Sequence, residues 1–312
     1  MSIDRLCWFA WLCVCAINWQ SATAAEGRFE VEQGETSLQV NLNGKPLATY
    51  VWSDPKTLRP YFAHVRTPAG IQVTRNHPPR EGQDATDHAE LHPGLWMAFG
   101  DISAHDFWRN KGTVRHASFV EPPRADEHGA AFAVRNAYVA EGQTVCEEVC
   151  RLRFDDAPSG YFITWDSTFS GPRAFYFGDQ EEMGLGVRVA TPIAVEQGGH
   201  IVDSQGRIDE EQVWGQVAKW CDYRGKIDGH AVGVLLMPDP TNFRPSWFHA
   251  RDYGVLVANP FGRNAFTKQD KSKVQVAPGE QLRLRFGVLV HEGDTDPAAA
   301  YATWLKRVKA ID

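Results

Sequence analysis

Short runs of alternating apolar and polar residues, separated by turn residues, recur along most of the chain. The clearest pair is SLQVNL at residues 37–42 and KPLATYVW at residues 45–52, joined by Asn43-Gly44. Asn-Gly suits a two-residue type I′ turn, so this pair predicts a β-hairpin. Further β-rich runs lie at residues 114–121, 131–139, 144–154, 161–169, 185–190, 230–237, 254–259, 273–276 and 281–291. Successive strands with short turns predict an antiparallel sandwich or barrel.

One segment near the C-terminus has helical periodicity instead. Asp296 can cap a helix and Pro297 suits its first position. A single apolar stripe follows at helical spacing, formed by Tyr301, Trp304, Leu305 and Val308. We expect this helix to pack against a sheet edge or an open end of the sandwich. No linker or repeat interrupts the pattern, so residues 26–312 are predicted to form one all-β domain, a large antiparallel β-sandwich with one C-terminal α-helix.

The first 25 residues have the layout of a signal peptide. Arg5 precedes an apolar run from Leu6 to Ile17, and Ala22-Thr23-Ala24 supplies the small residues of a cleavage site. The apolar run is about half of the ~20 residues that a membrane span needs. We therefore expect cleavage near residue 24 or 25 and a periplasmic or secreted protein with no membrane span in the mature chain. An uncleaved anchor is the alternative.

Composition narrows the class of protein. In 312 residues, 43% are hydrophobic and 23% are charged, which excludes a disordered chain. The net charge of −7, with no long basic run, argues against nucleic acid as the partner. Three cysteines remain after the predicted cleavage, namely Cys146, Cys150 and Cys221. The first two are too far apart on one strand for a bridge, so we expect all three to be buried and reduced.

The densest group of chemically active residues lies between residues 74 and 112. Its candidate site residues are Arg75, His88, His92, Trp96, Asp101 and Trp108. Polar loops on a rigid β scaffold commonly carry function, although a solvated loop is the plain alternative. His88 and His92 suit acid–base chemistry. They also suit a divalent metal, with Asp87 or Glu90 in support, but no cofactor is required by the pattern.

Two further groups add carboxylates and arginines. Glu182 and Arg188 lie six residues apart and share a face of a regular strand. His249 and Asp252 could form a pair in which the carboxylate orients the imidazole, with Arg251 beside them. A strand-end salt bridge and a structural turn are the respective alternatives.

The chemistry of the three groups favours a carbohydrate ligand. The chain has no G-x-S-x-G nucleophile elbow and no dinucleotide or Walker fingerprint. Tryptophan faces stack on sugar rings, while carboxylates and arginines bind hydroxyl groups. A small-molecule carbohydrate is therefore the expected partner.

Four segments resemble a family of secreted bacterial proteins of uncharacterised activity. They are RPYFAHVRTPAG, DHAELHPGLWMAFGDISAHDFW, EEMGLGVRVATP and HARDYGVLVANPFG. Members of that family often carry a methane-oxygenase (PmoA) label, which does not fit a chain without several membrane spans. Asp87-His88 matches the family's Asp-His pair, but fewer histidines follow it here. The resemblance implies a galactose-mutarotase-like β supersandwich.

These observations lead to one preferred hypothesis and two alternatives. The preferred one is an exported enzyme acting on a sugar or glycoside as an epimerase, lyase or hydrolase. His88 or His92 would work with Glu182 as acid and base, a division of work that the resemblance implies. We expect one concave pocket formed by His88, His92, Glu182, Arg188 and His249, with Trp96 or Trp108 as a stacking face. The alternatives are a non-catalytic carbohydrate-binding protein and a metal-dependent hydrolase or oxygenase.

Overall fold

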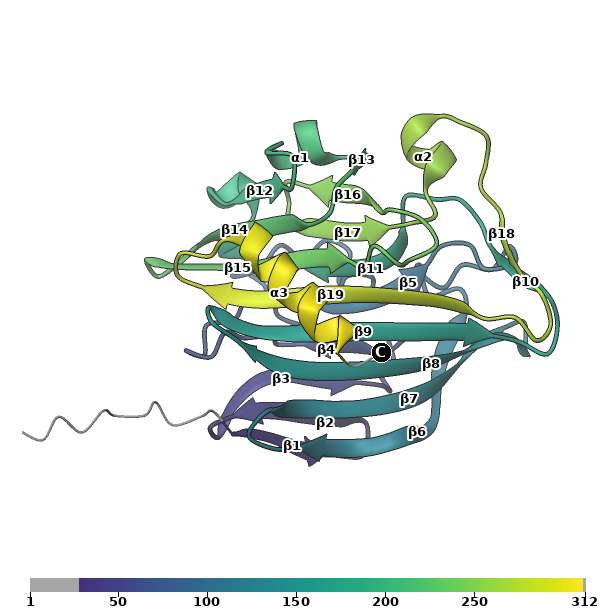
Figure 1. The fold of residues 1–312 in the computed structure, drawn as a ribbon, viewed down its shortest axis with the longest axis horizontal. Coiled ribbons are helices and arrows are strands. Elements are labelled where there is room, and N and C mark those ends of the chain that lie inside the picture. Colours follow the sequence, from purple (N-terminus) through teal and green to yellow (C-terminus); the bar gives the residue numbers. More distant parts are fainter. Residues whose placement is uncertain (1–27, 311–312) are drawn as a thin grey trace, which may run out of the picture.

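Two large antiparallel sheets pack face to face (Figure 1). The computed structural model describes residues 28–310. The nine-stranded sheet has the order β1 (Phe29–Gln33), β2 (Ser37–Leu42), β3 (Lys45–Val51), β4 (Tyr61–Ala63), β5 (Leu95–Phe99), β11 (Met183–Arg188), β17 (Val255–Asn259), β16 (Trp247–Arg251) and β13 (Gln216–Val217). The eight-stranded sheet has the order β12 (His200–Asp203), β14 (Cys221–Ile227), β15 (His230–Pro238), β19 (Leu282–Glu292), β9 (Gly160–Ser170), β8 (Gln143–Ala157), β7 (Gly129–Ala140) and β6 (Thr113–Ala125). A third sheet pairs β10 (Phe175–Phe177) with β18 (Val274–Val276). The predicted all-β antiparallel sandwich is therefore confirmed.

The predicted hairpin is present between β2 and β3. Asn43 has φ 53° and Gly44 has φ 72°, the pair of positive angles that a type I′ turn requires. Every predicted strand run overlaps an observed strand. The short strands β4, β10, β12 and β13, together with β1, β5, β14 and β16, were not predicted.

Strand β5 shows why some strands escape detection by alternation. Its five residues, LWMAF, are all buried. Leu95, Met97 and Phe99 face the core between the sheets, while Trp96 and Ala98 lie in a second apolar cluster on the outer face. A strand buried on both faces reads as a continuous apolar run, so it carries no period-two signal.

The C-terminal helix α3 (Pro297–Lys309) begins as predicted but packs elsewhere. Asp296 accepts hydrogen bonds from the backbone N–H groups of residues 298 and 299, at 2.9 and 3.2 Å. The helix crosses the outer face of the eight-stranded sheet, so its expected place at a sheet edge or an open end of the sandwich is wrong (Figure 1). Trp304 donates to Thr164 Oγ1 at 3.0 Å and lies over Gly287, where a Cβ would meet the indole at 2.5 Å. The missing side chain on β19 makes room for the helix.

The remaining helical segments are single turns. They are the α-helices α1 (Asp209–Val213) and α2 (Arg263–Thr267) and the 3₁₀ turns Thr191–Ile193 and Val195–Gln197. No helix within residues 28–310 is both long and apolar enough to cross a membrane. The predicted signal peptide, residues 1–25, lies outside the described residues.

The three cysteines of the described chain are free and buried, as expected. Cys146 and Cys150 lie on β8, and Cys221 on β14. Burial raises the pKa of each thiol, so none is a reactive thiolate.

Candidate active site

The outer face of the nine-stranded sheet carries most of the candidate residues, and segments 64–94 and 100–112 cover part of it. We call it the loop-covered face. Strand alternation places Leu185 and Val187 of β11 in the core, so Arg188 projects to this face. The same alternation brings His249 and Arg251 of β16 to it, on either side of the core residue Ala250.

Asp87 is the centre of a charged cluster on this face. Both of its carboxylate oxygens accept from Arg188, at 2.7 and 2.8 Å. His88 Nδ1 lies 2.9 Å from the same carboxylate, and Arg75 lies 3.6 Å away. Partial burial would raise the pKa of Asp87, but the hydrogen bonds from Arg188 and His88 and the charges of both arginines outweigh it and lower the pKa well below its usual range. Asp87 is therefore ionised and fixed in place.

Arg75 holds the loop rather than facing a ligand. Its Nη1 donates to the carbonyl oxygens of Ala85 and Asp87, at 2.9 and 2.7 Å, and its Nη2 donates to that of His92 at 3.1 Å. Only 1% of Arg75 is exposed. Its expected role in binding substrate is corrected to positioning the backbone on either side of His88.

Four rings form a continuous stack from the surface into the molecule. Tyr253 and His88 have centroids 6.2 Å apart, His88 and His92 are 5.0 Å apart, and His92 and Trp96 are 5.1 Å apart. Trp108 packs edge-on against Trp96, and both indoles are buried. Neither tryptophan can therefore offer a face to a sugar, which corrects that expectation. The outer rings of the stack are His88 and Tyr253.

The two histidines of the stack differ sharply in environment. Half of the His88 side chain is exposed. His92 is 5% exposed, and burial, with the charge of Arg188, lowers its pKa to about 2. His92 is thus a neutral packing residue at neutral pH, which corrects its expected role as an acid or base. Of the two histidines, His88 is the one accessible to a ligand.

A polar pocket of about 360 Å³ opens beside the stack. Its lining residues are Arg109, Gln180, Glu181, Glu182, His249, Arg251, Tyr253 and Ala265. Arg109 forms an ion pair with Glu182. Glu181 lies 3.3 Å from His249 Nδ1 and 3.2 Å from Arg251. Two carboxylates and two guanidiniums therefore line the pocket, each donor beside an acceptor.

Glu181 and His249, which lie side by side in the pocket lining, both have shifted pKa values. The contact with His249, opposed by partial burial and helped by the charge of Arg251, lowers the pKa of Glu181. Burial lowers the pKa of His249, although Glu181 partly compensates. At neutral pH the pocket thus holds ionised Glu181 beside a neutral imidazole.

His88 and Glu182 lie on the same face but do not form a pair. His88 adjoins the pocket through Tyr253, which lines it, and Glu182 lines the pocket itself. Within residues 28–310, no hydrogen bond or ion pair joins His88 to Glu182. The five residues expected in one pocket are therefore gathered on one face, in two adjoining clusters that share Tyr253.

Two expected site residues have structural partners instead. Asp252 accepts from the backbone N–H of Glu210 at 2.9 Å, so Glu181 and not Asp252 is the carboxylate beside His249. Asp252 lies in the turn that follows β16, so strand alternation does not place it on the same face as His249. Asp101 accepts from the N–H of Ala104 at 2.9 Å and closes a turn outside the pocket.

Sequence reasoning missed Arg109, Glu181 and Tyr253 as members of the site. Glu181 is adjacent to Glu182 in the printed sequence, and alternation alone does not select between them. Tyr253 is next to a glycine at φ 109°, where the chain turns and presents the ring to the pocket. Only the fold brings these positions to Arg109, which lies more than 70 residues away.

Among residues 28–310, Asp87, His88 and His92 form the group that could hold a metal ion. One ligand atom from each lies within 4.8 Å of the others. These donor types suit a transition metal. However, both oxygens of Asp87 are bound by Arg188, and Arg75 adds a second positive charge nearby. A divalent cation would have to displace one guanidinium and lie beside another, so the arrangement favours Arg188 as the partner of Asp87.

A family model described as "Family of unknown function (DUF6807)" matches residues 37–305, and the chain belongs to this family. That description gives no activity, so it lends no support to the methane-oxygenase label. No curated protein matches the sequence.

Similar solved structures are remote in sequence. An α-galactosidase of Geobacillus stearothermophilus is 10% identical over 86% of this chain and 41% of its own, with a TM-score of 0.42. A 4-α-glucanotransferase of Thermococcus litoralis is 9% identical over 86% of this chain and 40% of its own, with a TM-score of 0.36. A galactose mutarotase-like protein of Clostridium acetobutylicum is 9% identical over 86% of this chain and 98% of its own, also at 0.36. The chain spans about two fifths of the first two enzymes, and no activity is carried over from any of the three.

Proposed function

We propose that this member of a family of unknown function is an enzyme that moves protons on a neutral sugar bound in the pocket beside Tyr253. The balanced lining is the observation that carries the proposal. Two carboxylates and two guanidiniums offer acceptors and donors in turn around about 360 Å³. Such a lining suits a small polyhydroxylated ligand rather than an ion.

His88 is the proposed base. Its Nδ1 faces Asp87, so the neutral ring donates from Nδ1 and keeps the lone pair of Nε2 for a substrate proton. This tautomer is assigned from the hydrogen-bond partner. Arg188 fixes Asp87, and the stack on His92 fixes the plane of the ring. The carboxylate then stabilises the imidazolium that forms, as in other carboxylate–histidine pairs.

Tyr253 is the proposed proton donor. Partial burial raises its pKa, opposed by the nearby charges of Arg188 and Arg251, so the phenol is protonated at neutral pH. Glu182 is ion-paired with Arg109 and is therefore an acceptor for sugar hydroxyls rather than an acid. Together, His88 would remove a proton from one position of the sugar while Tyr253 delivers one to an oxygen.

A metal-dependent hydrolase or oxygenase is the second candidate, favoured by the spacing of Asp87, His88 and His92. In that case these residues would hold the ion, which would polarise an oxygen of the substrate. Elemental analysis of the purified protein distinguishes the two candidates, since a stoichiometric metal would favour this one.

The proposal is tested by NMR of the purified protein with a panel of reducing hexoses and their methyl glycosides. The spectra report anomer exchange, elimination and glycoside cleavage separately. His88→Gln and Tyr253→Phe should each lower turnover about 100-fold, because each removes a proton-transfer group. His128→Gln, on the exposed β6–β7 turn, is the control and should leave turnover unchanged. Sugar binding without turnover would replace the proposal with the binding-protein alternative.

A further inference from the structure

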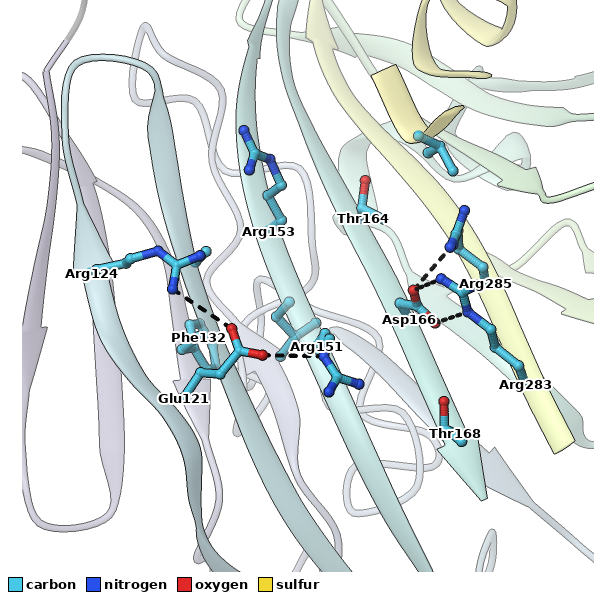
Figure 2. Close-up of a pocket in the computed structure, with 13 residues that line it drawn as sticks. Glu121, Arg124, Phe132, Arg151, Arg153, Thr164, Asp166, Thr168, Arg283 and Arg285 are labelled. Atoms are coloured by element: carbon cyan, nitrogen blue, oxygen red, sulfur yellow. Dashed lines mark hydrogen bonds and ion pairs between the residues drawn. The ribbon is translucent and has the colours of Figure 1, made fainter. Parts of the chain in front are cut away.

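A second hollow lies on the opposite side of the sandwich, on the outer face of the eight-stranded sheet beside α3 (Figure 2). Its volume is about 540 Å³. The strand registers explain the hollow. Ala133 of β7 lies between Glu121 of β6 and Arg151 of β8, and Ala131 lies between Arg124 and Arg153. The two alanines form a low floor between rows of long side chains.

Five arginines line the hollow. They are Arg124, Arg151, Arg153, Arg283 and Arg285, contributed by strands β6, β8 and β19 (Figure 2). Neighbouring strands lie about 4.8 Å apart, so these three strands recur at intervals of about 10 Å. The arginines therefore form three positive rows across about 20 Å of the sheet.

The carboxylates of the hollow do not match this charge. Glu121 and Asp166 are the two acidic residues in its lining. Glu121 is shared, since it lies 3.2 Å from Arg151 Nε and 3.6 Å from Arg124. Asp155 and Asp239, just outside the lining, contact Arg153 and Arg285. Asp166 is likewise shared, since it forms ion pairs with Arg283 and Arg285. The lining thus holds five arginines and two carboxylates, a local excess of positive charge in a chain whose formal net charge is −7.

The arginines around Glu121 are also accessible. About two thirds of the Arg124 side chain and half of the Arg151 side chain are exposed. The one side-chain hydrogen bond of Arg151 within the described chain runs from Nε to Glu121, so its terminal nitrogens are available to a ligand. Guanidiniums bind carboxylate and sulfate groups in a bidentate manner.

We propose that this hollow, the arginine hollow, binds an acidic oligosaccharide through its carboxylate or sulfate groups. Arg124 and Arg151 would bind one anionic group, and the arginines of β19 would lie near the next. The Glu121 carboxylate would accept hydrogen bonds from sugar hydroxyls, and the hydroxyls of Thr164 and Thr168 would accept or donate them. The site is separate from the pocket beside Tyr253, and the proposal does not depend on the function proposed there.

The mixture of donors and acceptors favours an acidic sugar over nucleic acid. A phosphodiester chain offers few hydroxyl donors, so Glu121 and Asp166 would repel it without compensation. The only aromatic residue of the lining, Phe132, is buried in the core, so no ring is available to stack on a base.

The test uses titration calorimetry of the full mature protein with two short ligands, an oligouronate and a sulfated oligosaccharide. Arg124→Gln with Arg151→Gln should weaken binding about tenfold or more, because charged hydrogen bonds are lost. Glu121→Gln should strengthen binding, because the amide oxygen still accepts from a sugar hydroxyl while the charge that competes for Arg124 and Arg151 is removed. Comparing the two ligands shows whether carboxylate or sulfate is preferred.

The control is a double variant with the same loss of charge outside the hollow. Arg115 and Arg135 lie on β6 and β7 beyond its lining. Arg115→Gln with Arg135→Gln should leave affinity nearly unchanged. Equal losses in both double variants, no binding of either ligand by the unaltered protein, or stronger binding of an oligonucleotide of equal charge would each overturn the proposal. If the first double variant does not fold, Glu121→Gln decides, since unchanged affinity in it also contradicts the proposal.

Discussion

At the scale of single residues, the contact between Asp87 and Arg188 determines whether the candidate active site is formed. Arg188 is 1% exposed, and Asp87 is its bidentate partner. Asp87→Asn would leave a buried guanidinium without its counter-ion. We expect a loss of about 2 kcal/mol in the free energy of unfolding, less than for a fully buried pair because Asp87 is partly exposed. Urea unfolding measures it.

A double-mutant cycle supplies the control for this prediction. Arg188→Met removes the buried charge, so Asp87→Asn should cost much less in that background. Equal costs of Asp87→Asn in both backgrounds would show that the two side chains do not interact energetically.

The same contacts show what the sequence could predict about the site. The density of charged and aromatic residues predicted one pocket for His88, Arg188 and His249, whereas the structure places them in two adjoining clusters on one face. Their partners could not be predicted, because Glu181 reaches His249 from a separate segment while Asp252, only three residues away, is turned toward Glu210. Trp96 was expected to face a ligand, but His92 lies on it. Which side chains cover a ring such as Trp96 depends on the path of the loops, and loop sequences have no periodic pattern from which that path could be predicted.

At the scale of elements, the packing of α3 rests on Trp304 and the glycine beneath it. Trp304→Ala should destabilise the protein by about 3–5 kcal/mol, since it empties a buried site and removes the hydrogen bond to Thr164. Gly287→Ala should also destabilise, by about 1–3 kcal/mol, because a Cβ would meet the indole. Thermal unfolding measures both. Lys306→Ala, on the exposed side of the helix, is the control, and an equal effect there would contradict this account.

Most of the long strands and the C-terminal helix could be predicted from the sequence, but the way they pack could not. Strands with one face in the core alternate in polarity, so most of the long strands, such as β7 and β8, were identified. Strand β5 is buried on both faces and carries no such signal. The helix was identified from its cap and stripe, yet its position depends on Gly287, which in the sequence is one glycine among many.

At the scale of the whole molecule, residues 1–25 remain a prediction about export. We propose that they direct the protein out of the cytoplasm and are then removed. Mass spectrometry of protein recovered from the periplasmic and extracellular fractions should give a chain that begins near residue 25. An intact N-terminus on protein recovered from these fractions would contradict cleavage, and recovery from the cytoplasm alone would contradict export.

Acid sensitivity is a second property of the whole molecule, because several histidines are buried. Burial lowers the pKa of His77 to about 4, although Asp54 partly compensates, and it lowers the pKa of His92 to about 2. Burial also lowers the pKa of His249. His77 and His92 therefore stay neutral in the folded protein well below pH ~6.5, where each takes up a proton in the unfolded chain. Burial raises the pKa of Glu148, so this one carboxyl has the opposite effect on the pH dependence of stability.

The sign of the pH dependence follows from this difference in bound protons. Between pH ~6.5 and ~4.5 the unfolded chain binds more protons, so the free energy of unfolding falls as the pH falls. His77 and His92 each contribute up to about 1.4 kcal/mol per pH unit. His92→Phe keeps the ring stack but cannot titrate, so it should reduce the slope by about that amount in urea unfolding at a series of pH values. His128→Phe, at an exposed turn, should keep the slope of the unaltered protein. If His92→Phe leaves the slope unchanged, His92 is already protonated in the folded state, and its neutral place between His88 and Trp96 is wrong.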